Sequence, residues 1–208
     1  MEVSSPGPKT AVLHTTSGVV LANPPRDVSA MLDPEGGHTI ALFPRLTDNA
    51  ALESGDAAVH IIGRPGEFEV GSAYIQGVAV APRIEHQNDD DIDIIHVVDD
   101  GALRVGVLAD LRTIPEKAAR TALNNLHALI VIPNASLDSS SLASLVRDID
   151  VKLVLVVGGA ADDTIAEPLQ KLLKELGSGD DVQRLASFTV KASAPSQDKA
   201  TVVVLKVK

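Results

Sequence analysis

The order of hydrophobic and polar positions divides the chain into a strand-rich first half and a second half in which strands and helices alternate. In the first half, short runs of Val, Ile and Leu are separated by Gly, Pro and Asn, which is typical of β-strands joined by turns. This pattern predicts a hairpin from 10–13 and 19–22, strands over 38–43 and 57–62, and a second hairpin from 94–98 and 103–108. We expect residues 1–9 to be a frayed lead-in and residues 10–208 to form a single domain.

From residue 114 onward, apolar positions recur at helical spacing. They predict helices over 114–126, 139–148 and 162–176. Continuous apolar runs between them predict buried strands over 128–132 and 151–157, the latter ended by Gly158-Gly159. Strands over 186–190 and 201–207 complete a layered α/β protein with more than one sheet.

The segment Ile61–Gly71 has the most strongly specified backbone of the chain. Proline fixes φ and glycine permits positive φ, so Gly63-Arg64-Pro65-Gly66 predicts a tight corner between two strands. Glu67 and Glu69 fall on the same side of the second strand and could form an acid/base pair. A carboxylate pair beside a turn is more often structural, and we favour that interpretation.

Composition narrows the classes of function. The 208 residues are 45% hydrophobic but only 2% aromatic, so Val, Leu, Ile and Ala must build the core. A net charge of −10 disfavours nucleic acid and anionic membranes as partners, and the absence of cysteine excludes disulfides and Cys-ligated zinc. No apolar run approaches the roughly 20 residues that span a bilayer. We therefore expect an acidic cytoplasmic protein.

Local metal and nucleophile motifs are missing from the sequence. The six histidines are widely spaced and form no His-x-His or His-Glu-x-x-His pair, so we expect each to be a surface or strand-face residue. Asp89-Asp90-Asp91 with Asp93 lacks the glycine and distal Glu of an EF-hand loop, which favours a solvated acidic loop. No Gly-x-Ser-x-Gly motif supports serine hydrolase chemistry.

The corner motif carries a resemblance to a known family. Gly63-Arg64-Pro65-Gly66-Glu67-Phe68-Glu69-Val70-Gly71 resembles the Gly-Pro-Gly-Glu-Tyr-Glu-Val-Gly signature of a bacterial and archaeal branch of the metallo-β-lactamase-fold hydrolases. Segments 100–111, 128–133, 172–177 and 201–205 are similar to later segments of that branch, in the same order. The resemblance implies an αββα sandwich of two mixed β-sheets flanked by helices. It also implies a metal site at one edge, where a metal-activated water performs hydrolysis.

The resemblance also implies where the metal ligands should be, and this chain lacks most of them. The family's His-x-His-x-Asp-His loop falls on Pro44, Leu46, Asp48 and Asn49, and its last histidine falls on Gly158. Asp110 matches the family's bridging aspartate. Two aspartates and an asparagine provide no imidazole, so we expect no zinc centre. The corner residues Gly63, Pro65, Gly66, Glu67, Glu69 and Gly71 lie outside the family's ligands, which favours a structural role.

These residues predict a pseudoenzyme with a degenerate metal site. We expect a scaffold or binding protein without a cofactor, whose partner is an unknown protein or a second copy of the chain. The first alternative is a hydrolase in which Asp48, Asn49 and Asp110 hold one Mg or Mn ion through oxygen ligands. The second is small-molecule binding in the remnant of the active-site cleft.

Overall fold

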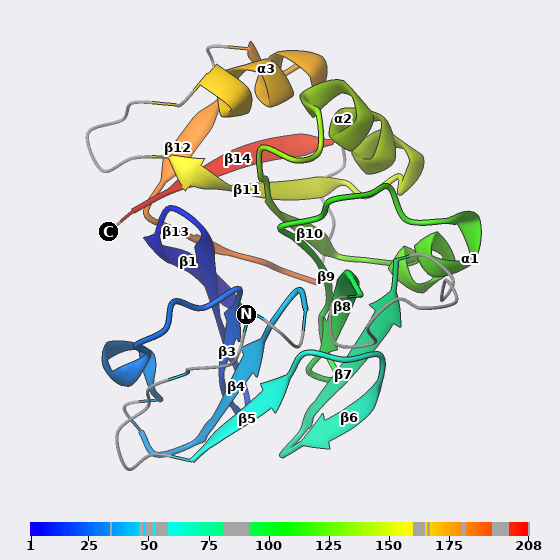
Figure 1. The fold of residues 1–208 in the computed structure, drawn as a ribbon. Coiled ribbons are helices and arrows are strands. Elements are labelled where there is room, and N and C mark those ends of the chain that lie inside the picture. Colours follow the sequence, from blue (N-terminus) through cyan, green and yellow to red (C-terminus); the bar gives the residue numbers. More distant parts are fainter. Residues whose placement is uncertain are drawn as a thin grey trace.

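The computed structural model describes residues 1–33, 35–45, 48, 52, 58–80, 92–159, 165, 167–179, 182–192 and 200–207. Two mixed β-sheets face each other across a hydrophobic interior (Figure 1). This confirms the predicted sandwich of two mixed sheets.

The first sheet has six strands in the order β13-β1-β2-β3-β4-β5. Its strands β13, β1, β2 and β3 are antiparallel neighbours, whereas β3, β4 and β5 are parallel. The predicted first hairpin is confirmed as β2 and β3. The bounds are β1 Glu2–Gly7, β2 Thr10–Thr15, β3 Gly18–Ala22, β4 His38–Leu42, β5 Val59–Ile62 and β13 Ser187–Thr189.

The prediction of a frayed lead-in is wrong. Residues 2–7 form β1, which pairs with β2 on one side and β13 on the other. Val3 and Ser5 are fully buried. The Pro and Gly residues that suggested fraying are accommodated by an irregularity in the ladder between Ser4 and Gly7.

The second sheet has eight strands in the order β12-β14-β11-β10-β9-β8-β7-β6. Strands β6 to β9 are antiparallel neighbours, and β9, β10, β11, β14 and β12 are parallel. The predicted hairpin around Asp99-Asp100-Gly101-Ala102 is confirmed, because β8 pairs with β9. The bounds are β6 Gly66–Val70, β7 Ala73–Ala79, β8 Ile94–Asp99, β9 Arg104–Ala109, β10 Ala128–Ile132, β11 Leu153–Gly159, β12 Gln183–Leu185 and β14 Thr201–Lys206.

The chain passes between the sheets at both lateral edges of the sandwich. At one edge, β5 leads through the corner at residues 63–65 into β6. At the other edge, β12 continues into β13 across the single residue Ala186. The predicted strand over 186–190 is confirmed as β13, and the short strand β12 precedes it in the other sheet.

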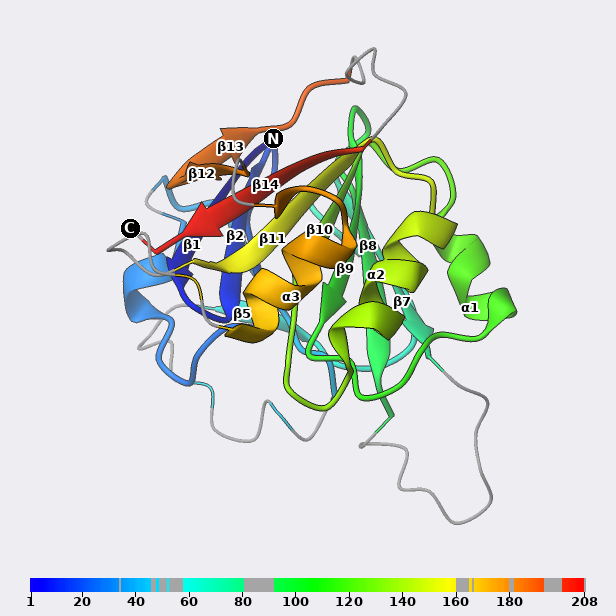
Figure 2. The same ribbon diagram turned by 90° about the horizontal axis from the view of Figure 1, so that it is seen from above.

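Within the described residues, three helices cover the outer face of the eight-stranded sheet (Figure 2). They are α1 Lys117–Arg120, continued by the 3₁₀ turn η4 Thr121–Leu123, then α2 Ser139–Asp148 and α3 Glu167–Glu175. Helix α2 has the predicted bounds. Its N-cap is Asp138, whose carboxylate accepts from the Ser141 N–H at 2.9 Å.

The other two helices are shorter than predicted. The helix over 114–126 begins only after the extended residue Glu116, and it ends before Asn125, whose φ is +58°. Helix α3 begins at Glu167, and residues 162–164 of the predicted helix lie outside the described part of the chain.

The hydrophobic core lies in layers on both faces of the eight-stranded sheet. Inward-facing side chains such as Leu42, Ile75 and Ile130 fill the space between the sheets, and Leu108, Leu129 and Leu172 pack beneath the helices. On the outer face of the six-stranded sheet, a smaller cluster around Leu21 and Val28 is joined by the 3₁₀ turn η1 Ser29–Met31.

Candidate functional site

The candidate site lies at one end of the sandwich, where loops from both sheets meet. Arg45 and Asp48 follow β4 of the six-stranded sheet, and Asp110 follows β9 of the eight-stranded sheet. Asp93 immediately precedes β8. Because β8 runs antiparallel to β9, the start of β8 and the end of β9 lie at the same end of that sheet.

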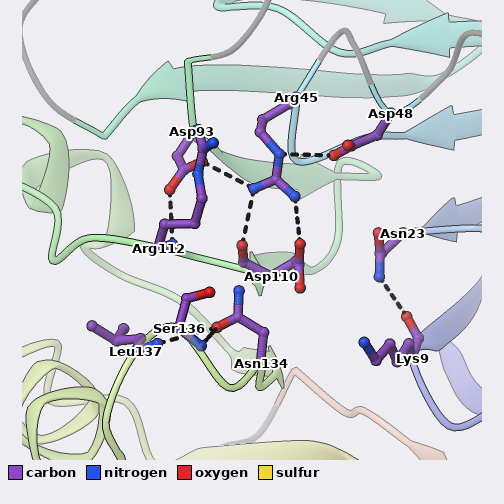
Figure 3. A network of polar contacts seen from close by, with 10 residues as sticks. All are labelled: Lys9, Asn23, Arg45, Asp48, Asp93, Asp110, Arg112, Asn134, Ser136 and Leu137. Atoms are coloured by element: carbon purple, nitrogen blue, oxygen red, sulfur yellow. Dashed lines mark hydrogen bonds and ion pairs between the residues drawn. The ribbon is translucent and has the colours of Figure 1, made fainter.

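Arg45 is at the centre of a network of polar contacts (Figure 3). Its Nη1 donates to Asp93 Oδ1 at 3.0 Å and to the main-chain carbonyl of Asp110 at 3.1 Å. Its Nη2 donates to the Asp110 carboxylate, and its Nε lies 3.1 Å from Asp48 Oδ2. One guanidinium therefore contacts three carboxylates, and it joins the loop after β4 to both neighbouring loops of the other sheet.

Asp93 is the most buried carboxylate of the network, with 4% of its side chain exposed. Besides Arg45, it binds Arg112 through three contacts of 2.8 Å, which involve the main-chain N–H, Nε and Nη2. A buried carboxylate is stable only when its charge and lone pairs are satisfied, and two arginines provide that here.

The backbone of Asp110 helps to form the site. Its φ of +50° lies in the left-handed region, which Asp tolerates better than most residues. In this conformation both its carbonyl and its carboxylate reach Arg45, while its N–H donates to the carbonyl of Ile132 at 3.0 Å.

The environment shifts the pKa values of two network members. Burial alone would lower the pKa of Arg45, but hydrogen bonds to Asp110 and Asp93 outweigh burial and raise it above its ordinary value. Burial raises the pKa of Asp48, and Arg45 opposes this shift. The Arg45 guanidinium is therefore a permanent positive charge at the site.

The residues present do not fit the metal centre that the fold implies. Among the described residues, no group of three His, Cys, Asp or Glu side chains is arranged to hold a metal ion. Asp48, Asp93 and Asp110 converge, but they converge on Arg45. Pro44 and Gly158 stand at expected ligand positions and carry no donor side chain.

The structure brings together two of the four predicted remnant-site residues, Asp48 and Asp110, through Arg45. Asn49 lies outside the described residues. Gly158 does not end its strand as predicted, because β11 extends to Gly159 with a register shift after Val157. The φ of +135° at Gly158 suits glycine and accommodates this irregularity.

Sequence reasoning missed Arg45, Asp93 and Arg112. Asp93 was assigned to a solvated acidic loop, and this is wrong because the side chain is buried against two arginines. No local pattern marks this burial, because alternation would place Asp91 and Asp93 on the face opposite to the apolar Ile92 and Ile94.

The corner motif forms a contact between the sheets, away from this network. Gly66, with φ +149°, starts the edge strand β6, on which Glu67 and Glu69 are exposed. Gly71 packs closely against His38 and Ser17 of the other sheet, and the Ser72 N–H donates to Ser17 Oγ at 2.7 Å. The glutamates do not converge with another described catalytic group, which favours the structural interpretation.

Two histidine environments were not evident from the sequence. His38 and His60, 22 positions apart, lie on adjacent strands with ring centroids 5.4 Å apart. His96 is fully buried in β8, and its Nε2 has no hydrogen-bond partner among the described residues. Burial lowers the pKa of His96 from 6.5 to about 4.

Comparison with known proteins gives the fold class. No family model matches the sequence, and no curated protein sequence matches it. The structure superposes on a metallo-β-lactamase superfamily protein from Thermotoga maritima with a TM-score of 0.69 and 16% identity, covering 100% of this chain and 99% of that one.

Two further structures agree with this match. Isothiocyanate hydrolase from Delia radicum gut bacteria has a TM-score of 0.55 at 8% identity, covering 98% of this chain and 96% of its own. The metallo-β-lactamase fold protein YhfI from Bacillus subtilis has a TM-score of 0.51 at 11% identity, covering 76% and 85%. The chain thus has the metallo-β-lactamase fold.

The surface pockets and the helices add two observations. The described pockets are lined by other segments, including the β2–β3 turn and α3, and none of them is lined by Arg45 or Asp110. In the described part of the chain, no helix has the length and apolar character needed to cross a membrane.

Proposed function

We propose that this chain is a metallo-β-lactamase-fold protein that does not perform metal-dependent hydrolysis and instead acts as a binding or scaffold protein. The supporting observation is the Arg45 guanidinium, which engages Asp48, Asp93 and Asp110 at the end of the sandwich where the fold implies a metal. A hydrolase of this class needs a Lewis-acidic metal and a bound water at that position. An arginine with its donors committed to carboxylates supplies neither.

The main alternative is a hydrolase with one hard cation bound by oxygen ligands. Magnesium and manganese prefer carboxylates, so Asp48 and Asp110 have the right chemistry. Both carboxylates already contact Arg45, however, and a divalent cation beside a fixed guanidinium would experience charge repulsion. The second alternative, small-molecule binding in the remnant cleft, has no supporting observation of its own among the described residues.

Metal analysis of the full chain, purified without chelator, tests the proposal. We expect less than stoichiometric zinc, manganese or magnesium, and no phosphodiesterase or lactonase activity when manganese is added. A metal-loaded hydrolase of the same fold, assayed in parallel, shows that the assays would detect activity. Stoichiometric metal in the wild-type protein, or activity that disappears in Asp110→Ala, would overturn the proposal.

The binding role requires a partner, either a second copy of the chain or another protein. Sedimentation of the native protein over a range of concentrations tests self-association directly. Affinity capture with the folded protein, using a heat-denatured sample as control, tests for a different partner. A strictly monomeric protein that captures nothing specifically would count against the scaffold role.

A further inference from the structure

The loops at the candidate site come from two sheets, and within the described network Arg45 is the residue that connects them. Its side chain belongs to the loop after β4, while Asp93 and Asp110 belong to the other sheet. A main-chain hydrogen bond also connects the two sheets here, because the Ile94 N–H donates to the Pro44 carbonyl at 2.8 Å. A cation at this position therefore stabilises the junction between the sheets.

We propose that the Arg45 guanidinium takes the structural place of the metal ion, as a built-in cation that holds the loops of the two sheets together. This inference rests on the proposed absence of a resident metal. It adds that the three carboxylates at this end of the sandwich form a cation-binding group whose cation is part of the chain.

The charges of the network support this role. Asp48, Asp93 and Asp110 carry three negative charges, and Arg45 and Arg112 carry two positive ones, so the group has a net charge of −1. Without Arg45 the same group would have a net charge of −2, with only Arg112 opposing three carboxylates. Mutual repulsion would then favour entry of a small divalent cation at the vacated position.

The geometry distinguishes this arrangement from an ordinary surface ion pair. Only 9% of the Arg45 side chain is exposed, and its three nitrogens contact three carboxylates and one main-chain carbonyl. A guanidinium presents its donors in a fixed planar fork, whereas an ammonium is a single point charge. Lysine at this position would therefore keep the charge but lose simultaneous contact with the three carboxylates.

The alternative explanation is that Arg45 is a buried ion pair without a metal-like role. In that case replacing Arg45 alone should destabilise the protein by leaving buried carboxylates uncompensated, and added divalent cations should not restore the stability. Cation-dependent stability of an Arg45 variant separates the two explanations, because a merely structural ion pair does not predict it.

The test is a thermal melt of metal-free protein with and without millimolar Mn²⁺ or Mg²⁺. We expect Arg45→Ala and Arg45→Met to melt below the wild type and to regain much of the loss when either cation is added. The wild type should not respond. The double variant Arg45→Ala with Asp110→Asn should lose the recovery, because it lacks one of the three carboxylates.

Arg120→Ala is the matched control, since Arg120 pairs with Asp148 on the surface, away from the network. It should not respond to either cation. If Arg45→Ala is unfolded without metal, refolding with Mn²⁺ should recover it. An Arg45 variant that is indifferent to both cations, or that fails to refold with them, overturns the inference.

The wild-type metal content is a separate outcome, and it decides only the proposed function. A metal-free wild type with an Arg45 variant that ignores the cations would leave the proposed function in place and remove this inference. A wild type that carries stoichiometric metal would remove the proposed function itself.

Discussion

The guanidinium of Arg45 lies 3.0 Å from the carboxylate of Asp93, and less than a tenth of either side chain is exposed. Asp93 is also bound by Arg112, so this carboxylate is shared by two arginines. The two residues are 48 positions apart in the chain and belong to loops of different sheets. We therefore expect loss of the Asp93 charge to destabilise the network more than loss of any other charge in it.

Asp93→Asn should lower the free energy of unfolding by about 3–5 kcal/mol, because the change keeps the shape but removes the buried anion that Arg45 and the more exposed Arg112 share. Urea denaturation measures this. Asp99→Asn is the control, since Asp99 forms a longer contact of 3.8 Å with Arg104 in a more exposed position. It should cost less than about 1 kcal/mol. Equal costs for the two variants would contradict the special role of Asp93.

His96 makes the protein sensitive to acid. The unfolded chain binds a proton at this histidine below its ordinary pKa of 6.5, whereas the folded protein resists protonation until about pH 4. Stability from the neutral imidazole is therefore complete above pH 6.5 and is lost as the pH falls from 6.5 to about 4. The loss should amount to about 3 kcal/mol.

His96→Leu should remove this component, so that the wild type and the variant diverge in stability as the pH is lowered. Urea denaturation at several pH values measures the difference. His14→Gln, a change at an exposed strand position, should leave the pH profile unaltered. A constant difference between wild type and His96→Leu across the range would show that His96 does not titrate with folding.

Gly66→Val should lower the melting temperature, whereas Glu67→Gln should not. The backbone at Gly66 has a φ of +149°, and a Cβ there would lie 3.1 Å from the ring of Phe68. A β-branched residue tolerates this conformation poorly. Glu67 is exposed on the edge strand, so loss of its charge removes no buried contact. A Gly66→Val protein with the wild-type melting temperature would rule out a structural role for the turn.

Gly77→Ala tests the corner between β5 and β6 from the neighbouring strand β7. Gly77 lies opposite Gly66 in the ladder, and a Cβ at Gly77 would lie 2.6 Å from the main-chain oxygen of Arg64. The corner must move to accept a methyl group, which should cost about 1–3 kcal/mol. Gly7→Ala, where no atom lies within 4 Å of the added carbon, should be close to neutral. Chemical denaturation compares the two.

Much of the fold could be predicted because its signals are local. Alternating and continuous apolar runs predicted the strands β2 to β4 and β8 to β11, and apolar positions at helical spacing predicted α2. The strand β1 was missed because its Pro and Gly residues suggest disorder when read locally. Pairing with β13, nearly two hundred residues later in the chain, supplies the order.

The candidate site was harder to predict, because its decisive contact joins distant parts of the sequence. Asp48 and Asp110 could be named from their positions after strands, and both do meet at the site. Arg45 lies between Pro44 and Leu46, two positions that the resemblance assigns to metal ligands, and nothing local marks it as a site residue. Its role depends on Asp93 and Asp110, 48 and 65 positions away, and no local pattern records that convergence.

The pairing of β1 with β13 has a consequence for synthesis of the protein. In a nascent chain, β1 is synthesised long before the partner for its outer edge, which is made only when residues 187–189 are translated. The bridge between Ser5 and Val207 forms later still. Until then the first strand has unpaired backbone groups, which can capture strands of other chains. Completion of the six-stranded sheet therefore has to wait until residues 187–189 have left the ribosome.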